Sequence, residues 1–275
     1  MPYRKSKPWG QLKPPVGSRI NWGHPLSVGL ISCCLLNEGA GGIARDIVRN
    51  YNGTLTNMAS PGTSTSGWTV GRFGRGVAFD NSNDAISLPT STFFDITTQV
   101  TIAVWAKQTT NGDVVLCCRN VAGSEGYELR ASRASSDKFN FVVVISGSAK
   151  IATGNTGVNA SVNKWMHIVG TFGRGNVNIY VNGILEGTTA ASGSCRSTSG
   201  AAMGIGRDVA NSLNSYAGVI DHCMIWNREL YAGEIMKLYT DPFCIIESPR
   251  RRIISQVVSA TTGRLLALRR KMVTA

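Results

Sequence analysis

The stretch VNIYVNGIL, residues 177–185, decides the fold class of this chain, because it contains two short strands and the turn between them. Apolar and polar residues alternate before Asn182-Gly183, and apolar residues resume directly after it, as in strands that bury one face. Asn and Gly both tolerate the positive φ angles of a type I′ turn. This stretch therefore predicts a tight antiparallel hairpin.

Segments of the same kind lie on both sides of the hairpin, separated by turns that use many of the 31 glycines. We expect further strands at residues 26–36, 76–79, 85–88, 100–107, 113–118, 126–131, 138–146, 165–172 and 218–226. One helix is expected at residues 232–239, ended by Asp241-Pro242. Many short strands with almost no helix predict an all-β fold, an antiparallel two-sheet β-sandwich around one core.

The positive charge of the chain is confined to its two ends. Residues 1–24 carry five basic residues and no acidic one, and residues 248–275 carry seven and none, so the ends account for the whole net charge of +12. We therefore expect a basic N-terminal arm at 1–25, a neutral sandwich at 26–247 and a basic C-terminal arm at 248–275. A neutral body argues against nucleic acid as a partner. Extended basic arms favour docking on an acidic protein or polymer surface.

The first residues lack the apolar core of a signal peptide, and no apolar run approaches the length of a membrane span. The cysteines show no CxxC or His/Cys spacing of the kind that binds zinc. We expect all seven to be reduced and mostly buried, at positions Cys33, Cys34, Cys117, Cys118, Cys195, Cys223 and Cys244.

Three segments carry a resemblance to a known family. They are residues 68–84 (WTVGRFGRGVAFDNSND), residues 164–183 with KWMHIVGTF and NIYVNG, and residues 218–235 with GVIDHCMIWNREL. In this order and spacing, residues 26–242 resemble the laminin-G-like jelly roll within the concanavalin-A-like and pentraxin-like sandwiches. The opening up to NWGHPL at residues 21–26 resembles laminin-G-like proteins encoded by tailed bacteriophages. That resemblance implies a virion component, located in the capsid or tail and assembled in the host cytoplasm.

The sequence offers little for catalysis. It has no Glu-x-Asp-x-Glu cluster of the sort glycosidases place on such a sandwich, and no Gly-x-Ser-x-Gly elbow. His24 falls in the N-terminal arm, whereas His167 and His222 fall inside predicted strands, so we expect packed or surface histidines. The sequence therefore predicts a binding or structural protein and not an enzyme.

The resemblance also implies a calcium site, in which a loop after the first strand meets an aspartate of the last strand. The matching positions are Asp46, Asn50 and Asp221. The loop departs from the family in residues 47–49, and Arg49 would oppose a cation. The alternative is that Asp221 hydrogen-bonds the backbone of a turn. Asp80 and Asp84 form a second and weaker metal candidate. Calcium would assist binding and is not expected to be required for folding.

Exposed aromatic rings would be needed for glycan binding, and three residues are candidates by type: Tyr127, Tyr216 and Trp68. Three other aromatics lie in strands that alternate as buried strands do, and we expect them in the core: Trp105, Trp165 and Trp226.

These observations predict a non-enzymatic virion structural protein, a capsid decoration or tail-associated protein that displays a jelly-roll domain. Its partners would be other virion proteins and further copies of the chain. The residues expected to anchor it to these partners are Trp9, Trp22, Arg250, Arg251 and Arg252. The alternative is a carbohydrate-binding module or adhesin that recognises cell-surface glycans, assisted by calcium.

Overall fold

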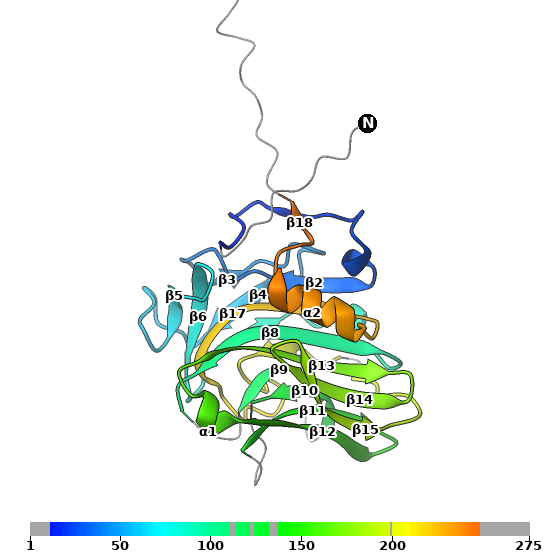
Figure 1. Cartoon of the computed structure of the whole chain (residues 1–275). Coiled ribbons are helices and arrows are strands. Elements are labelled where there is room, and N and C mark those ends of the chain that lie inside the picture. Colours follow the sequence, from blue (N-terminus) through cyan, green and yellow to red (C-terminus); the bar gives the residue numbers. More distant parts are fainter. Residues whose placement is uncertain (1–11, 111–113, 122–123, 132–136, 199, 248–275) are drawn as a thin grey trace, which may run out of the picture.

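The computed structural model describes residues 12–110, 114–121, 124–131, 137–198 and 200–247, and the statements below concern these residues. They form two stacked antiparallel sheets with a short layer of helix and terminal strands over one of them (Figure 1). The all-β antiparallel sandwich expected from the sequence is confirmed. Within the described ranges, no helix has the length and apolar character needed to cross a membrane.

Sheet I contains eight strands, with the order β15-β14-β13-β8-β17-β6-β5 and β2 paired to β17. The strands are β2 (Leu30–Cys34), β5 (Gly67–Val70), β6 (Arg75–Asp80), β8 (Val100–Gln108), β13 (Trp165–Gly173), β14 (Asn176–Val181), β15 (Ile184–Ala190) and β17 (Ala217–Trp226). The predicted hairpin is confirmed as β14 and β15. Its turn residues Asn182 and Gly183 have φ angles of 51° and 83°, as a type I′ turn requires.

Sheet II also contains eight strands, in the order β12-β11-β10-β9-β16-β7-β4-β3. They are β3 (Ile43–Ala44), β4 (Gly53–Thr56), β7 (Ala85–Leu88), β9 (Val115–Val121), β10 (Ser124–Arg130), β11 (Lys138–Ile145), β12 (Ser148–Gly157) and β16 (Met203–Ile205). The sequence did not predict β12, because this edge strand is largely polar and only alternate residues such as Ala152 are buried. An edge strand with one partner needs no continuous apolar pattern.

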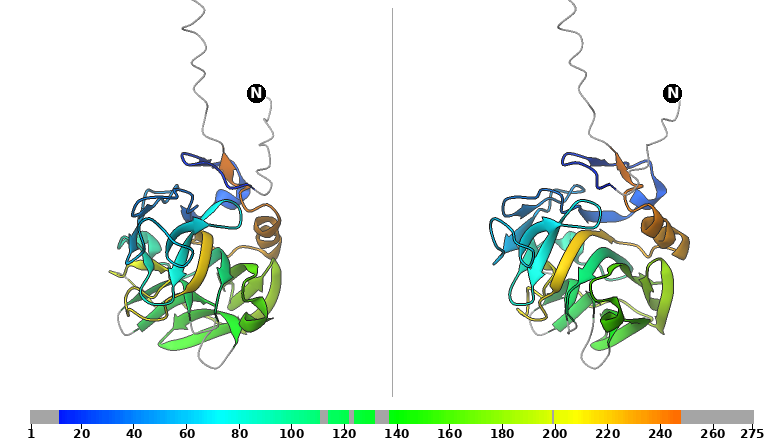
Figure 2. Two further views of the ribbon diagram at one scale, coloured as in Figure 1. Left: turned by 90° about the vertical axis from the view of Figure 1, so that its left-hand side faces the viewer. Right: turned by 60° about the vertical axis from the view of Figure 1, so that its left-hand side comes forward.

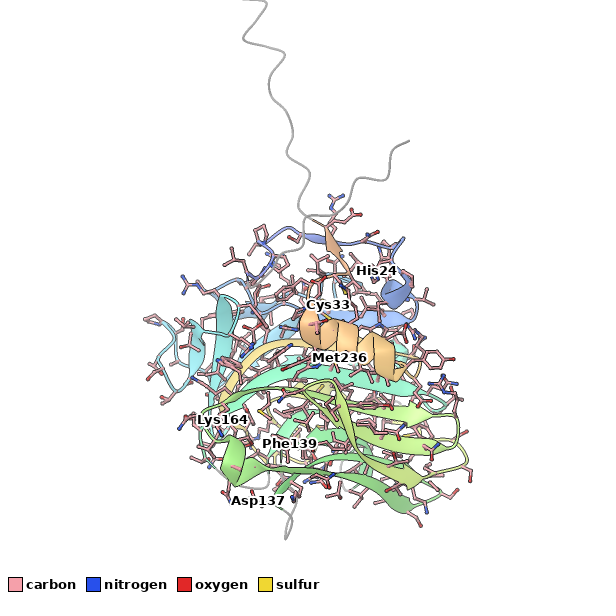
Figure 3. The ribbon with its side chains drawn as sticks, in the orientation of Figure 1. His24, Cys33, Asp137, Phe139, Lys164 and Met236 are labelled. Atoms are coloured by element: carbon pink, nitrogen blue, oxygen red, sulfur yellow. The ribbon has the colours of Figure 1, made fainter. Side chains whose placement is uncertain are left out.

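The main core lies between the sheets and includes Phe141 and Phe139 of β11. Figure 3 labels Phe139. A second apolar group, here called the outer cluster, lies on the opposite face of sheet I. Strand β8 serves both groups, since Ile102 and Val104 enter the main core whereas Ala103 and Trp105 enter the outer cluster. Burial on both faces explains why β8 reads as an almost unbroken apolar run.

The outer cluster is covered by α2 (Ala232–Thr240), which is the helix the sequence predicted, and by segments from both chain ends. Strand β1 (Arg19–Ile20) pairs with β18 (Ile246–Glu247), so the first and last described strands lie side by side at one end of the molecule (Figures 1 and 2). Short helical turns occur at η1 (Pro25–Ser27), η2 (Thr92–Phe94) and α1 (Val158–Ser161). The first of these replaces the start of the predicted strand 26–36.

The N-terminal arm predicted at residues 1–25 differs from the structure over its described part. Residues 12–25 lie against the sandwich, with the Lys13 amide donating to the Phe73 carbonyl at 2.8 Å and Ile20 buried in the outer cluster. The reason is that this segment supplies apolar cover and one buried ammonium to the outer face of sheet I. Trp9, Arg250, Arg251 and Arg252 lie outside the described residues, as does the C-terminal arm, 248–275. Trp22 is 60% exposed.

Candidate functional site

Asp46, the first residue of the expected calcium site, is buried and binds the backbone of its own loop. Its carboxylate accepts hydrogen bonds from the amides of Cys33 (2.8 Å) and Arg49 (3.0 Å), and from those of Val48 and Tyr51 at 3.3 Å. Asn50 is exposed in the same loop and has a φ of 61°. Both carboxylate oxygens of Asp46 are therefore already engaged in shaping the loop.

Asp221 is buried in β17 and faces other partners. Its Oδ1 lies 2.9 Å from Lys13 Nζ and 2.7 Å from His222 Nδ1, and its Oδ2 accepts a hydrogen bond from the Phe73 amide at 3.0 Å. Burial alone would raise the pKa of Asp221, but the His222 hydrogen bond and the Lys13 charge lower it to about 2. The bond to Phe73 is the turn contact that the sequence left as the alternative. The three predicted ligands do not fit a calcium ion, because a lysine ammonium already neutralises Asp221.

Asp80 and Asp84, the weaker metal candidate, close the turn between β6 and β7. The Asp84 carboxylate accepts from the Asp80 amide at 3.2 Å, and Asp80 accepts from the Ser82 amide at 2.8 Å. Burial raises the pKa of Asp84. These bonds give both aspartates a local structural role.

The three aromatic residues named as glycan candidates are all buried, which corrects that expectation. Tyr127 donates its hydroxyl hydrogen to the Phe94 carbonyl at 2.7 Å, and Trp68 donates Nε1–H to the Gly41 carbonyl at 2.6 Å. Tyr216 packs in the main core. Because all three rings are buried, they cannot present a ring face to a sugar.

Other side chains lie as the sequence predicted. Trp105 and Trp226 are buried, and Trp165 is half-buried against the outer cluster. His167 and His222 are buried, and burial lowers the pKa of both, that of His167 to about 3. All seven cysteines are free, and all except the half-buried Cys244 are buried.

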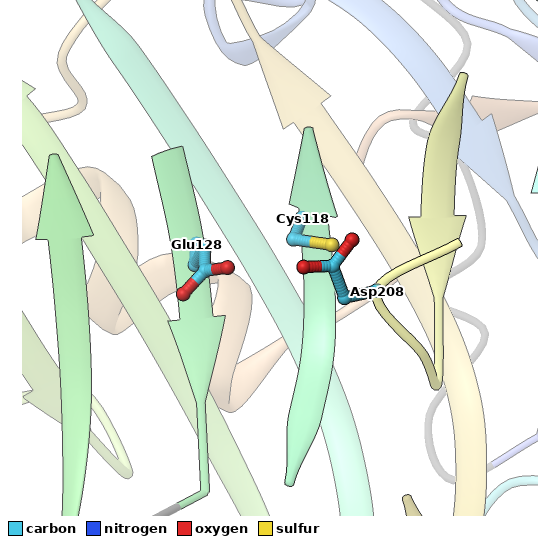
Figure 4. A group of neighbouring side chains, drawn as sticks. All are labelled: Cys118, Glu128 and Asp208. Carbon is cyan, nitrogen blue, oxygen red and sulfur yellow. The ribbon is translucent and has the colours of Figure 1, made fainter. Parts of the chain in front are cut away.

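A polar cluster that the sequence did not reveal lies on the face of sheet II directed away from the main core (Figure 4). Cys118 of β9 and Glu128 of β10 are paired across the strands, and Asp208 follows β16. Their thiol and carboxylate atoms lie within 4.8 Å of one another. Asn120 Nδ2 donates to both carboxylates, at 2.9 Å to Asp208, and Arg130 pairs with Glu128.

This cluster is closed to solvent, with Cys118, Glu128 and Asp208 all buried. Burial raises the pKa of the Cys118 thiol, and the nearby carboxylates raise it further. Asp208 also accepts from the Asn211 amide at 3.1 Å, which holds the turn after β16 over the sheet. Because amide and guanidinium donors already satisfy the carboxylates, the cluster is best explained as an internal network that fixes β9, β10 and this turn.

An open polar site lies at the other sheet, where the β13–β14 turn meets the segment between β17 and α2. We call it the Tyr231 site, and its members are Arg174, Asn178, Thr188, Glu229 and Tyr231. The Tyr231 side chain is 62% exposed, and the Arg174 guanidinium carbon lies 3.9 Å from its ring centroid. Arg174 Nε also pairs with Glu229 Oε2 at 2.8 Å. The site thus combines an exposed aromatic ring and an exposed cation with a buried carboxylate.

Regular structure fixes each member of the Tyr231 site. Asn178 Nδ2 donates to Glu229 Oε1 at 3.3 Å, and Thr188 on the neighbouring strand donates to Asn178 Oδ1 at 2.8 Å. Gly173 gives Glu229 its room, because a Cβ at that position would stand 2.7 Å from Glu229 Oε2. A row of hydrogen bonds therefore leads from the buried carboxylate to the exposed Thr188 and Arg174.

The backbone at Tyr231 is fixed by the start of α2. Glu234 accepts a hydrogen bond from the Tyr231 amide at 2.9 Å, and its two oxygens receive the guanidinium of Arg228 at 2.7 and 2.9 Å. Burial opposes ionisation of Glu234, but these bonds outweigh it and lower the pKa. The only sequence signals for this site are the two-residue turn Arg174-Gly175 and a tyrosine, Tyr231, directly before a predicted helix. The contact between them spans distant parts of the chain.

The architecture described above has a known counterpart. Residues 80–236 match the profile of the concanavalin A-like lectin/glucanases superfamily, which is more than half of the chain. The chain belongs to this superfamily. No curated protein matches its sequence, so the comparisons that follow concern the concanavalin A-like fold.

Solved structures share the concanavalin A-like fold with this chain at low sequence identity. The binding domain of Paraclostridial Mosquitocidal Protein 1 is 16% identical with a TM-score of 0.58, over 79% of this chain and 53% of that one. Domain 4 of the extracellular arabinanase of Geobacillus stearothermophilus, in complex with arabinotriose, is 16% identical with a TM-score of 0.50, over 76% and 98%. Trypanosoma rangeli sialidase in complex with sialic acid is 16% identical with a TM-score of 0.53, over 79% and 34%. The chain thus spans about half of the first protein and a third of the last.

Proposed function

We propose that this concanavalin A-like domain is a non-catalytic carbohydrate-binding module, and that the Tyr231 site receives the sugar. The observation that carries the proposal is the exposed Tyr231 ring held beside the Arg174–Glu229 ion pair. Sugar rings bind proteins through stacking of their C–H faces on aromatic rings, together with hydrogen bonds from a few fixed polar groups. Tyr231 would supply the stacking surface, and Arg174 and Thr188 would supply the hydrogen bonds.

Two features support this assignment. The members of the Tyr231 site are held by sheet I and the start of α2, so little side-chain order has to be gained on binding. Similar folds have been solved with sugars, as in the arabinanase domain with arabinotriose. Glu229 is held by Arg174 and Asn178 and would orient Arg174, and we propose no acid–base role for it.

A Tyr231→Ala variant is expected to lose at least about tenfold in affinity for any glycan that binds the wild-type chain. Truncating a central aromatic hot spot costs about 2 kcal/mol or more, and about 1.4 kcal/mol corresponds to a factor of ten. A glycan array would identify the ligand, and titration calorimetry would compare the variants.

The matched control is Phe93→Ala. Phe93 is also a half-exposed ring with a guanidinium above it, that of Arg49 at 4.0 Å, but it lies in a different part of the chain. We expect the Phe93→Ala variant to bind the glycan with the affinity of the wild type. Because the module is proposed to be non-catalytic, we also expect the glycan to be recovered uncut after binding. Equal losses in both variants, or loss only in Phe93→Ala, would contradict the Tyr231 assignment.

As a second function we propose attachment to a larger assembly such as a virion, through the chain ends. The observation in its favour is that β1 and β18 pair, with the exposed Trp22 just beyond β1. In the sequence, the basic residues of 1–11 precede the described part of the chain, and those of 248–275 follow β18. Basic chain ends together with an exposed aromatic residue suit docking on an acidic protein surface.

Removing residues 1–11 and 248–275 together is expected to abolish co-purification with the native assembly while the circular dichroism of the sandwich is kept. Attachment of the full chain should also weaken as salt rises, because exposed charge pairs are screened. Full attachment of the truncated chain would place the docking surface on the sandwich itself.

A further inference from the structure

The ammonium of Lys13 sits inside a shell of oxygen atoms. Its Nζ lies 2.7 Å from the carbonyl oxygen of Asp221, 2.9 Å from Asp221 Oδ1 and 3.5 Å from the carbonyl oxygen of Leu36. It also donates to the Arg75 carbonyl. The Lys13 side chain is 3% exposed. Three carbonyl groups and a carboxylate converge here from Arg75 in β6, from the buried Asp221 within β17 and from Leu36 just after β2. The sandwich itself therefore builds this oxygen-lined site, here called the cation seat.

The shell carries more negative charge than one ammonium balances. The Asp221 carboxylate pairs with Lys13 Nζ at 2.9 Å, and the Glu38 carboxylate acts on Lys13 through space. Glu38 Oε2 is buried and has no hydrogen-bond partner. One carboxylate and three carbonyls around the ammonium, with the Glu38 carboxylate acting through space, match the hard oxygen donors that Ca²⁺ prefers.

We infer that Lys13 is a tethered substitute for a divalent cation, occupying an oxygen-lined cation seat around Asp221. In this arrangement the seat is filled by the chain's own N-terminal segment and no metal is needed. Because the ammonium belongs to residue 13, filling the seat also fastens residues 12–20 to the sandwich, as the Lys13–Phe73 backbone bond and the β1–β18 pair show. Metal binding at Asp221 and docking of Lys13 are therefore mutually exclusive.

The test measures calcium binding to the full chain by titration calorimetry and by Tb³⁺ luminescence. The wild type is expected to show no binding that depends on Asp221, and chelator should leave its melting temperature unchanged. Lys13→Ala should gain one Ca²⁺ site, because its oxygen shell loses the ammonium and keeps its charge. The double variant Lys13→Ala/Asp221→Asn should lose that site.

Lys164→Ala is the matched control, since it removes an exposed lysine whose ammonium donates to the Ala160 carbonyl at 2.8 Å, and it should behave as the wild type. Should Lys13→Ala be poorly folded, the readout becomes recovery of its near-ultraviolet circular dichroism and melting temperature with added calcium. Recovery that Asp221→Asn abolishes supports the inference. A folded Lys13→Ala without a new site, no recovery by calcium, or Asp221-dependent calcium binding by the wild type overturns it.

Discussion

Asp221→Ala is expected to lower the free energy of unfolding by about 3–5 kcal/mol at pH 7, because it leaves the buried Lys13 ammonium without its carboxylate. The same change removes the acceptor of the Phe73 amide and the partner of His222. Urea denaturation would measure the loss. Removing both charges should be less harmful, since an unpaired buried charge costs more than a missing pair. We therefore expect Lys13→Ala/Asp221→Ala to be less destabilised than the sum of the single variants.

The same ion pair makes a prediction for pH. The pKa of Asp221 is lowered from 3.8 to about 2 in the folded chain, so folding favours its ionised form. That contribution is fully present above about pH 4 and is lost as the pH falls through about 2, amounting to roughly 2 kcal/mol. The wild type should therefore lose more stability than Asp221→Ala between pH 4 and 2. Parallel losses in the two proteins would show that Asp221 is not held by a buried cation.

Arg119→Ala is expected to lower the free energy of unfolding by about 3–5 kcal/mol, because this side chain is fully buried and lies over the ring of Phe94, a residue of the main core. The guanidinium donates to the carbonyls of Ala201 (2.7 Å) and Ser91 (3.0 Å) and to Thr198 Oγ1 (2.9 Å). Substitution would leave a cavity and buried acceptors without donors. Denaturant unfolding of the variant measures this cost.

Arg207→Ala is the control for Arg119. Arg207 also donates to two carbonyls, those of Asn83 and Ser212, both at 2.9 Å. These hydrogen bonds are exposed to solvent, so water can replace the guanidinium as donor. We expect a loss within about 1 kcal/mol for this variant. Similar losses of stability in the two variants would contradict the claim that the effect of Arg119→Ala arises from the burial of Arg119.

The sequence predicted those parts of the fold that depend on local patterns. Alternation around Asn182-Gly183 identified the β14–β15 hairpin, and the strand predicted at residues 218–226 is present as β17. The reduced cysteines and the buried Trp105 and Trp226 followed from the same patterns. The prediction that failed was the environment of amphipathic side chains. Tyr127 and Tyr216 could not be assigned to the core by residue type alone, because a tyrosine suits either environment.

The candidate sites could not be predicted because their members are far apart in the chain. Lys13 lies in a proline-rich segment that looks like a free arm, yet it pairs with Asp221, 208 positions later. Arg174 and Tyr231 meet only because β13, β14 and the start of α2 converge at one corner of sheet I. Only the three-dimensional arrangement shows that one aspartate is neutralised and one tyrosine is exposed.

The most direct test of carbohydrate binding is a crystal structure of the chain with the oligosaccharide selected on the array. We predict that a sugar ring stacks on Tyr231 and that its hydroxyl groups bond to Arg174 and Thr188. A sugar bound elsewhere, for example at Phe93 or over sheet II, with the Tyr231 ring free in solvent, would contradict the account.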